Sequence, residues 1–203
     1  YRNGRFCINI ALVEKGKPIF GMINNVCDGE ILWAFASGEK GMVKKGKEEA
    51  LSGIGGKQSK LRVAVSRFHV TEWELRYVDY LKSLGHEVEL VPLGASSKHC
   101  LLAKGEVDIC PKFGKCSEWD VAAGQVLVEA TGGYVVNAET GGEVRYNKEN
   151  MISPPFVMFG KRVYDEIKEG NKTFLDFKAK SVVKNDYLGA RRNEIKKQDI
   201  MEK

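Results

Sequence analysis

The hydrophobic pattern of this chain changes near residue 60, and that change constrains the fold more than any other feature. Before it, FCINIALVE (residues 6–14) and IFGMINNV (residues 19–26) alternate on either side of the turn KGKP. This pattern is typical of a β-hairpin. ILWAFAS follows between the turns CDGE and SGEKG, so the first 45 residues predict an antiparallel meander. Residues 46–60, with Gly, Ser and Lys but little apolar content, predict a surface loop.

From residue 61 onward, short apolar runs alternate with segments of helical periodicity. LRVAVS is typical of a buried strand. VTEWELRYVDYLKSLG has apolar side chains at helical spacing, namely Trp73, Tyr77, Leu81 and Leu84. Thr71 and Glu74 form a capping-box pattern at its start, and Gly85 marks its end. Further strands are predicted in HEVELVPL, VDIC, YVVN and FVMFG, and helices in SSKHCLLAKG and WDVAAGQVLVEATGG. This alternation predicts an α/β fold with helices packed on a central sheet.

The composition is that of an ordinary globular chain, with 203 residues, 43% of them hydrophobic and 29% charged. No apolar run approaches the roughly 20 residues that span a bilayer, so no membrane helix is predicted. The chain opens on Tyr1 and not on Met, and its natural start is expected upstream. The five scattered cysteines show neither C-x-x-C nor metal spacing, which favours reduced thiols in the cytoplasm over a zinc site.

The net charge of +5 is concentrated near the end of the chain. Residues 161–203 hold 12 Lys and Arg against 8 Asp and Glu, whereas the first 160 residues are nearly balanced. This mixture predicts a helix to about Glu169 and then a basic, partly helical, solvated tail. Contact with nucleic acid or an anionic membrane is the less favoured alternative, because interleaved acidic residues weaken the field that phosphate binding needs. The oligomeric state stays open.

The segment EWDVAAGQVLVEATGG places one carboxylate, Asp120, in the first turn of a helix of small and apolar residues. A helix N-terminus carries partial positive charge and unpaired N–H groups, which suit an anion. There, Asp120 is placed to hold a divalent ion while the N–H groups face a phosphate. The small residues Ala122, Ala123 and Gly124 would let the helix press closely against the sheet. The alternative is an ordinary N-capping aspartate, since one carboxylate does not make a metal site.

Three further segments, SRFH, GASSK and CPKFG, place phosphate-binding groups where a predicted strand ends. These groups are, in chain order, Ser66, Arg67, His69, Gly94, Ser96, Lys98 and Lys112. In open α/β sheets, ligands bind beyond the carboxyl ends of the strands. Each residue alone is ordinary at a surface or a helix cap. Together they predict one site for a multiply phosphorylated small molecule.

The motifs resemble those of one protein family. WDVAAGQVLVEATGG resembles the C-terminal signature of the inositol monophosphatase superfamily, W-D-x-A-A-G followed by a glutamate and two glycines. Other segments resemble its 3'(2'),5'-bisphosphate nucleotidase branch of the sulfate-assimilation type. NGRFCINIALVEKGKPIFG is similar to NGxFxVNIALIxxGxPxxG, SRFH to SRSH, PLGASSKHC to PLGSSLKFC, CPKFG to YPRFG, and TGGEVRYNK to TGxxLxYNK. The similarity runs from residue 1 to about residue 160.

The resemblance implies a layered α/β sandwich and Mg2+-dependent removal of the 3'-phosphate from adenosine 3',5'-bisphosphate, with related action on 3'-phosphoadenylyl sulfate. It implies that Asp120 is a metal ligand and also binds substrate. It further implies a nucleotide and phosphate pocket lined by Ser66, His69, Gly94, Ser96, Lys98 and Lys112. The chain would then divide into a remnant of an N-terminal sheet domain (1–60), a C-terminal α/β domain with the pocket (61–160) and the tail (161–203).

The sequence departs from the resembled pattern in two ways. Ala95 stands where serine is common, and Lys112 where arginine is common, which replaces a bidentate donor by a point charge. The glutamate pair and the D-P-x-D-G-T segment that supply the other metal ligands are expected upstream of Tyr1 and are not in the sequence. Metal-assisted phosphoryl hydrolysis needs several carboxylates. We therefore assign no catalytic residue, treat the fold as N-terminally truncated and expect this chain to be inactive.

Two other functions stay open. An inositol monophosphatase is one, but those enzymes usually resemble Y-x-E where this chain has CPK, and they lack a lysine at the place of Lys98. Two cations suit a substrate with two phosphates, which favours the nucleotidase. The other is a non-catalytic module that binds phosphorylated nucleotides, because the expected carboxylates are missing.

Overall fold

The computed structural model describes residues 6–53 and 59–177. Its first part is an antiparallel sheet whose strands neighbour one another in chain order. They are β1 (Cys7–Glu14), β2 (Lys17–Asn25), β3 (Glu30–Phe35), β4 (Lys40–Lys44) and β5 (Lys47–Glu49), with the short 3-10 helix η1 (Val26–Asp28) between β2 and β3. The predicted meander is confirmed.

The prediction of a surface loop over residues 46–60 is wrong at its start. Residues 47–49 form β5, which pairs with β4, and Leu51 beyond it is buried. The three residues of β5 all have exposed side chains, so their polar composition concealed a strand held by its backbone. Charged side chains of this kind are usual on the last strand of a sheet, where they oppose pairing with other chains.

The second part is a mixed sheet in the order β10-β12-β8-β6-β7. Its strands are β6 (Leu61–Ser66), β7 (Val88–Leu93), β8 (Ile109–Lys112), β10 (Tyr134–Asn137) and β12 (Phe156–Phe159). The first three run parallel, and β12 is antiparallel to β8 and to β10. All five predicted strands are confirmed. β9 (Cys116–Ser117) and β11 (Ile152–Ser153) form a separate antiparallel pair. This pair was not predicted, because a strand of two residues is too short to show an alternation of apolar and polar side chains.

The helices are α1 (Glu72–Ser83), α2 (Ser97–Ala103), α3 (Glu118–Ala130) and α4 (Lys161–Lys168), followed by the 3-10 helix η2 (Lys172–Leu175). The predicted capping box of α1 is confirmed, and the Glu74 carboxylate accepts a hydrogen bond of 2.8 Å from the Thr71 N–H. Gly85 follows the last turn with a φ of +90°, as expected for a glycine that ends a helix. No helix of the described ranges is both long and apolar enough to cross a membrane.

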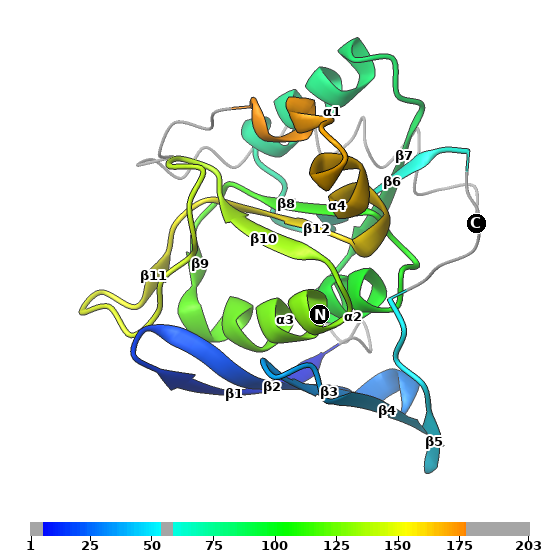
Figure 1. The fold of residues 1–203 in the computed structure, drawn as a ribbon, viewed down its shortest axis with the longest axis vertical. Helices are drawn as coiled ribbons and strands as arrows, with labels where there is room; N and C mark the ends of the chain where they lie inside the picture. Colours follow the sequence, from blue (N-terminus) through cyan, green and yellow to red (C-terminus); the bar gives the residue numbers. More distant parts are fainter. Residues whose placement is uncertain (1–5, 54–58, 178–203) are drawn as a thin grey trace.

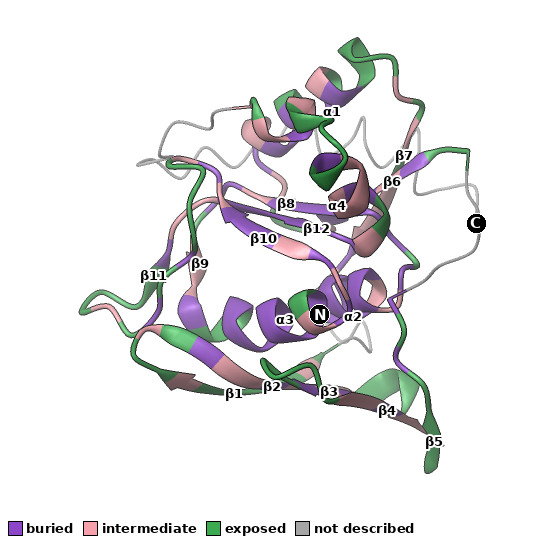
Figure 2. Ribbon diagram, in the orientation of Figure 1, coloured by how far each residue is buried: buried purple, intermediate pink, exposed green. Residues whose placement is uncertain are grey.

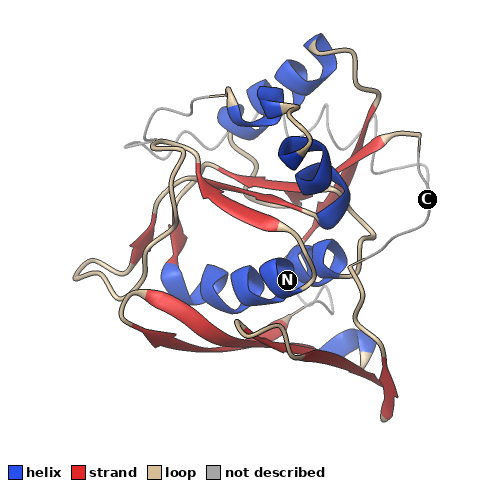
Figure 3. Ribbon diagram, in the orientation of Figure 1, coloured by secondary structure: helices blue, strands red, loops and turns tan. Residues whose placement is uncertain are grey.

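The elements stack in alternating layers (Figures 1 and 3). The meander lies below α2 and α3, the central sheet lies above these helices, and α1 and α4 cover its other face. The predicted layered α/β sandwich is confirmed. Within the ranges 6–53 and 59–177, no α-helix covers the outer face of the meander.

Helix α3 is almost wholly buried because it lies between the two sheets (Figure 2). One side packs on the central sheet through Val121, Ala122 and Val128, and the other packs on the meander through Ala123 and Val126. A Cβ at Gly21 of β2 would lie only 2.5 Å from the Ala123 carbonyl oxygen. The small residues of α3 thus permit close packing, as the sequence predicted.

The helix predicted to about Glu169 is confirmed as α4, but the segment from Lys161 to residue 177 packs on the core and is not the solvated tail that was predicted. Val163, Ile167 and Phe174 are buried in the core between the central sheet and α1. Val163 and Ile167 lie four residues apart on one face of α4, and the charges around them masked this stripe in the sequence. Residues 178–203 of the predicted tail lie outside the described residues, and the domain boundaries at 60 and 160 stay predictions.

Candidate functional site

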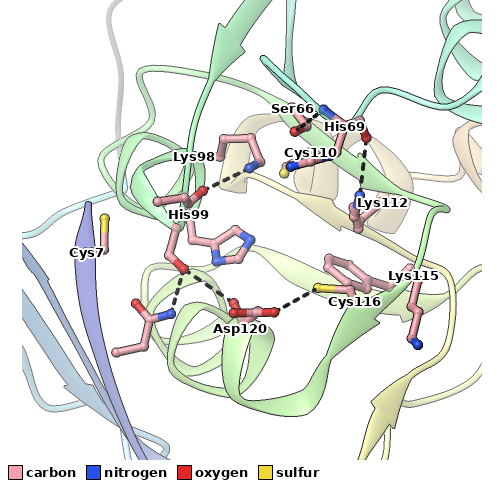
Figure 4. Close-up of a pocket in the computed structure, with 14 residues that line it drawn as sticks. Cys7, Ser66, His69, Lys98, His99, Cys110, Lys112, Lys115, Cys116 and Asp120 are labelled. Atoms are coloured by element: carbon pink, nitrogen blue, oxygen red, sulfur yellow. Dashed lines mark hydrogen bonds between the residues drawn. The ribbon is translucent and has the colours of Figure 1, made fainter. Parts of the chain in front are cut away.

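A cavity of about 430 Å³ lies at the carboxyl ends of the parallel strands β6, β7 and β8. Six of the predicted site residues line it together, namely Ser66, His69, Ser96, Lys98, Lys112 and Asp120 (Figure 4). The predicted convergence of separate strand ends on one crevice is therefore observed. Arg67 and Gly94 are not among the residues that line it. A Cβ at Gly94 would meet no atom within 4 Å, so this position has no steric need for glycine.

Lys98 lies in the first turn of α2 and is only 9% exposed. Its Nζ donates a hydrogen bond of 2.9 Å to the carbonyl oxygen of Ala95. Ala95 adopts a φ of +49°, a left-handed conformation that costs energy for a residue with a side chain. The turn between β7 and α2 thus holds the Lys98 ammonium at the cavity wall. The carbonyl group that accepts its hydrogen bond belongs to Ala95, where the resembled pattern commonly has serine.

Lys112 lies at the end of β8, where its charge is partly offset. Its Nζ is 3.9 Å from Oε1 of the buried Glu74 and 3.5 Å from the carbonyl oxygen of His69. Glu74 also accepts hydrogen bonds from the backbone N–H groups of Phe113 (3.0 Å) and Gly114 (3.4 Å). One carboxylate therefore caps α1, fixes the loop after β8 and holds Lys112 in place. The capping role was readable in the sequence, but the other two were not.

Asp120 is the third residue of α3, since the helix begins at Glu118 with Ser117 as its N-cap. One carboxylate oxygen, Oδ2, accepts hydrogen bonds from the Ser117 N–H (3.4 Å) and the Cys116 thiol (3.9 Å). The interpretation of Asp120 as the N-cap itself is therefore wrong, because it is the reciprocal partner in a capping box. Its side chain is exposed and lines the cavity, so capping and ligand binding are compatible.

The residues of ranges 6–53 and 59–177 do not make up a magnesium site on their own. They include no group of three or more His, Cys, Asp or Glu side chains placed to hold a metal ion. Asp120 is the one carboxylate among the described residues that line this cavity. A Mg2+ ion bound by protein usually needs at least one or two carboxylates, with water or substrate oxygens completing six ligands. The role of Asp120 as a metal ligand stays a prediction.

The meander supplies part of the cavity wall, which sequence reasoning missed. Cys7 and Asn9 of β1 both line the cavity. Asn9 Nδ2 donates a hydrogen bond of 2.7 Å to Ser96 Oγ and a longer one, 3.5 Å, to the carbonyl oxygen of Trp119. Asn9 therefore joins β1 to the start of α2 and of α3. Strand alternation shows which face a residue occupies, but not which distant loop that face meets.

Five further lining residues were also missed: His99, Cys110, Lys115, Cys116 and Phe156. Lys115 adds a third ammonium to the cavity. Burial raises the pKa of Cys116 to about 11 and raises that of Cys110, so both are neutral thiols near pH 7. Burial and the neighbouring Lys98 ammonium lower the pKa of His99 to about 3, which leaves its imidazole neutral. His99 therefore adds no positive charge to the cavity, whereas Lys98, Lys112 and Lys115 each bring an ammonium group.

The sequence model of the inositol monophosphatase family matches residues 1–169. The chain belongs to this family. The match extends past residue 160, where the predicted similarity ended, and includes α4, in agreement with the burial of that helix. Enzymes of this family are generally metal-dependent.

Several characterised relatives share one name. The chain is 36% identical over 162 residues to the 3'(2'),5'-bisphosphate nucleotidase CysQ of Salmonella typhimurium, and 35% identical over 162 residues to that of Escherichia coli. Each alignment covers 76% of this chain and 60% of the relative. The chain thus spans about 60% of the length of these relatives.

Solved structures agree with this relationship. CysQ from Bacteroides thetaiotaomicron, a bacterial member of the inositol monophosphatase family, superposes with a TM-score of 0.73 at 32% identity. That superposition covers 79% of this chain and 65% of the other. SuhB of Mycobacterium tuberculosis superposes with a TM-score of 0.62 at 17% identity over 85% of this chain and 67% of the other, which shows the shared fold alone.

Proposed function

We propose that this chain is part of a phosphatase that removes the 3'-phosphate from adenosine 3',5'-bisphosphate and acts on 3'-phosphoadenylyl sulfate as well. The observation that carries the proposal is the convergence of Lys98 and Lys112, from two different strand ends, on one cavity. Two cations at one site suit a ligand with two phosphates. The relatives named 3'(2'),5'-bisphosphate nucleotidase support the same substrate class.

We further propose that Asp120 supplies one ligand of a Mg2+ site whose other carboxylates lie outside the described residues. Metal ions in phosphatases neutralise the leaving oxygen and generate the attacking hydroxide, and two-metal sites need several carboxylates. The described residues alone would then bind the nucleotide without hydrolysing it. Their own contribution is to hold the phosphates with the ammonium groups and to limit water at the buried end of the cavity. We place this activity in the cytoplasm.

Calorimetric titration of the whole chain tests the binding proposal. We expect adenosine 3',5'-bisphosphate to bind more tightly than adenosine 5'-monophosphate. Lys98→Met and Lys112→Met should each weaken bisphosphate binding by about 10- to 100-fold, because each removes a charge-assisted hydrogen bond. Lys82→Met, which changes an exposed lysine on α1, is the matched control and should leave the affinity unchanged.

The same experiment separates the alternatives. Equal affinity for inositol monophosphate and adenosine 3',5'-bisphosphate would favour an inositol monophosphatase. Unchanged bisphosphate affinity in both lysine variants would reject the proposed site. A non-catalytic nucleotide-binding module is the second candidate, because Asp120 is the one carboxylate that the described part of the chain brings to the cavity. Release of phosphate from the bisphosphate by this chain with Mg2+, lost in Asp120→Asn, would exclude that module.

A further inference from the structure

His99 is a buried imidazole in the wall of the cavity, next in the chain to Lys98. The residue is only 5% exposed, yet it lines the cavity beside Lys98. Figure 4 shows its ring directed into the cavity between Lys98 and Asp120. An imidazole buried to this degree costs energy unless its nitrogens find partners.

The two ring nitrogens have different surroundings. Nδ1 is fully buried and has no hydrogen-bond partner anywhere in the described ranges. It packs against Gly124 of α3, where any Cβ would collide with the imidazole. Nε2 is not among the buried unpartnered atoms, so it is the nitrogen with access to the cavity. The absence of a side chain at position 124 thus makes the space that holds the ring in this orientation.

These surroundings determine where the proton of the neutral ring resides. A neutral imidazole carries one N–H donor and one bare nitrogen acceptor. A proton on Nδ1 would leave a buried donor with nothing to accept it, and a proton on Nε2 can be directed to a ligand in the cavity. The Nε2–H form is therefore favoured, and it presents an N–H donor at the buried end of the cavity.

We propose that His99 is a ligand-binding residue that donates a hydrogen bond from Nε2–H to a phosphate oxygen held in the cavity. Phosphate oxygens are strong acceptors, and hydrogen bonds to charged acceptors are the stronger kind. The lysine ammonium groups already make protein contacts, Lys98 to Ala95 and Lys112 to His69. The Nε2–H group of His99 then adds a hydrogen-bond donor of fixed direction to the positive charges of these lysines. This inference rests on the proposed function only in requiring a phosphate group in the cavity.

Nuclear magnetic resonance of the ¹⁵N-labelled full chain, titrated with inorganic phosphate, tests the proposal. The imidazole nitrogens of His99 should report the Nε2–H tautomer, and the Nε2 signals should shift with a saturating dependence on phosphate. His99→Phe, which keeps a ring and removes the donor, should raise the Kd for phosphate by about 3- to 10-fold. His99→Gln, whose amide nitrogen reaches a similar position, should restore most of the affinity.

A matched control is His86→Phe, because His86 stacks on Phe174 away from the cavity. It should leave the Kd for phosphate unchanged. The proposal would be overturned if His99 carried its proton on Nδ1 or if its signals did not change at saturating phosphate. It would also be overturned if the chain did not bind phosphate, or if His99→Phe left the Kd for phosphate unchanged. Phosphate binding through His99 without affinity for adenosine 3',5'-bisphosphate would uphold it and reject the nucleotide function. Bisphosphate binding that His99→Phe does not weaken would reject the role of His99 alone.

Discussion

The two sheets of this molecule differ in how they are covered. The central sheet has a buried core on each face, one against α1 and α4 and one against α3. Among the described residues, the meander is buried on its inner face, against α2 and α3, while β1 exposes Ile8, Ile10 and Leu12 by 49%, 49% and 57%. A strictly alternating strand therefore shows which side chains share a face, but it does not show whether that face is covered.

The cavity lies where these two regions meet. Its lysines come from α2, from β8 and from the loop that follows β8, and Asn9 comes from the partly covered meander. Helix α3 lies between them and carries Asp120 at its first turn. The comparison predicts that changes on the central sheet and at the α3 contacts affect stability strongly, and that changes on the outer face of the meander affect it little.

The largest effect is expected in the central core. Phe159→Ala removes a side chain with no exposed surface, and we expect the free energy of unfolding to fall by about 3–5 kcal/mol. Phe35→Ala on the meander, where the side chain is 41% exposed, should cost about 1 kcal/mol or less. Urea denaturation of both variants measures the difference. Equal losses of unfolding free energy in the two variants would show that the outer face of the meander is covered in solution.

The contact between α3 and the meander should give the next largest effect. Gly21→Ala forces a Cβ against the Ala123 backbone, and such overpacking should cost about 1–3 kcal/mol. Gly94→Ala is the matched control, because a Cβ there meets no atom within 4 Å and the backbone is not left-handed. Its unfolding free energy should stay within about 1 kcal/mol of the wild type. Equal stability of the two variants would contradict the close packing of α3.

Two buried carboxylates, Asp108 just before β8 and Glu30 in β3, each lie between two cations, which makes stability depend on pH. Burial raises the pKa of Asp108, but hydrogen bonds from Arg62 and Arg162 outweigh it and leave this pKa below its ordinary value of 3.8. The unfolded chain then binds more protons in acid. The stabilisation is present above the unfolded pKa and is lost as the pH falls through the lower folded pKa.

Glu30 of the meander follows the same rule. Burial raises its pKa, and hydrogen bonds from Lys44 and Lys104 lower it below its ordinary value of 4.5. We expect the wild-type free energy of unfolding to decrease from about pH 5 to pH 3, and Asp108→Asn and Glu30→Gln each to flatten that decrease. Denaturant titrations across this range measure it. An increase in the wild-type free energy of unfolding toward pH 3 would contradict this prediction.

The smallest effect is expected on the outer face of the meander. Ile10→Thr should change the unfolding free energy by about 0.5 kcal/mol or less, because the side chain is half exposed. It should also reduce self-association, since exposed apolar rows on an edge strand promote pairing between chains. Sedimentation velocity measures the second effect. Ile23→Thr on the buried inner face is the control and should be markedly less stable than Ile10→Thr.

Much of the fold was predictable because local rules and tertiary packing agree in it. The capping box of α1 needs only Thr71 and Glu74, and every predicted strand of the central sheet is a short apolar run. The failures have specific causes. Strand β5 depends on backbone pairing that its charged residues conceal, and α4 shows its apolar stripe only when the sheet is present to bury it.

The site was predictable to the extent that strand ends in a parallel sheet must meet. This rule places Ser66, Lys98 and Lys112 around one cavity without knowledge of any distance. It could not find Asn9, which reaches the cavity from the other sheet. Nor could it find His99, whose orientation depends on the absence of a side chain at Gly124 in a different helix. Such residues belong to a site through packing alone, and no local pattern records them.

The most direct test of the account is a crystal structure of the chain with adenosine 3',5'-bisphosphate. We expect one phosphate to place an oxygen within about 2.7–3.2 Å of Lys98 Nζ, and the ligand to lie between Lys98, Lys112 and Asp120. A ligand bound elsewhere on the molecule, with only solvent at the carboxyl ends of β6, β7 and β8, would contradict it.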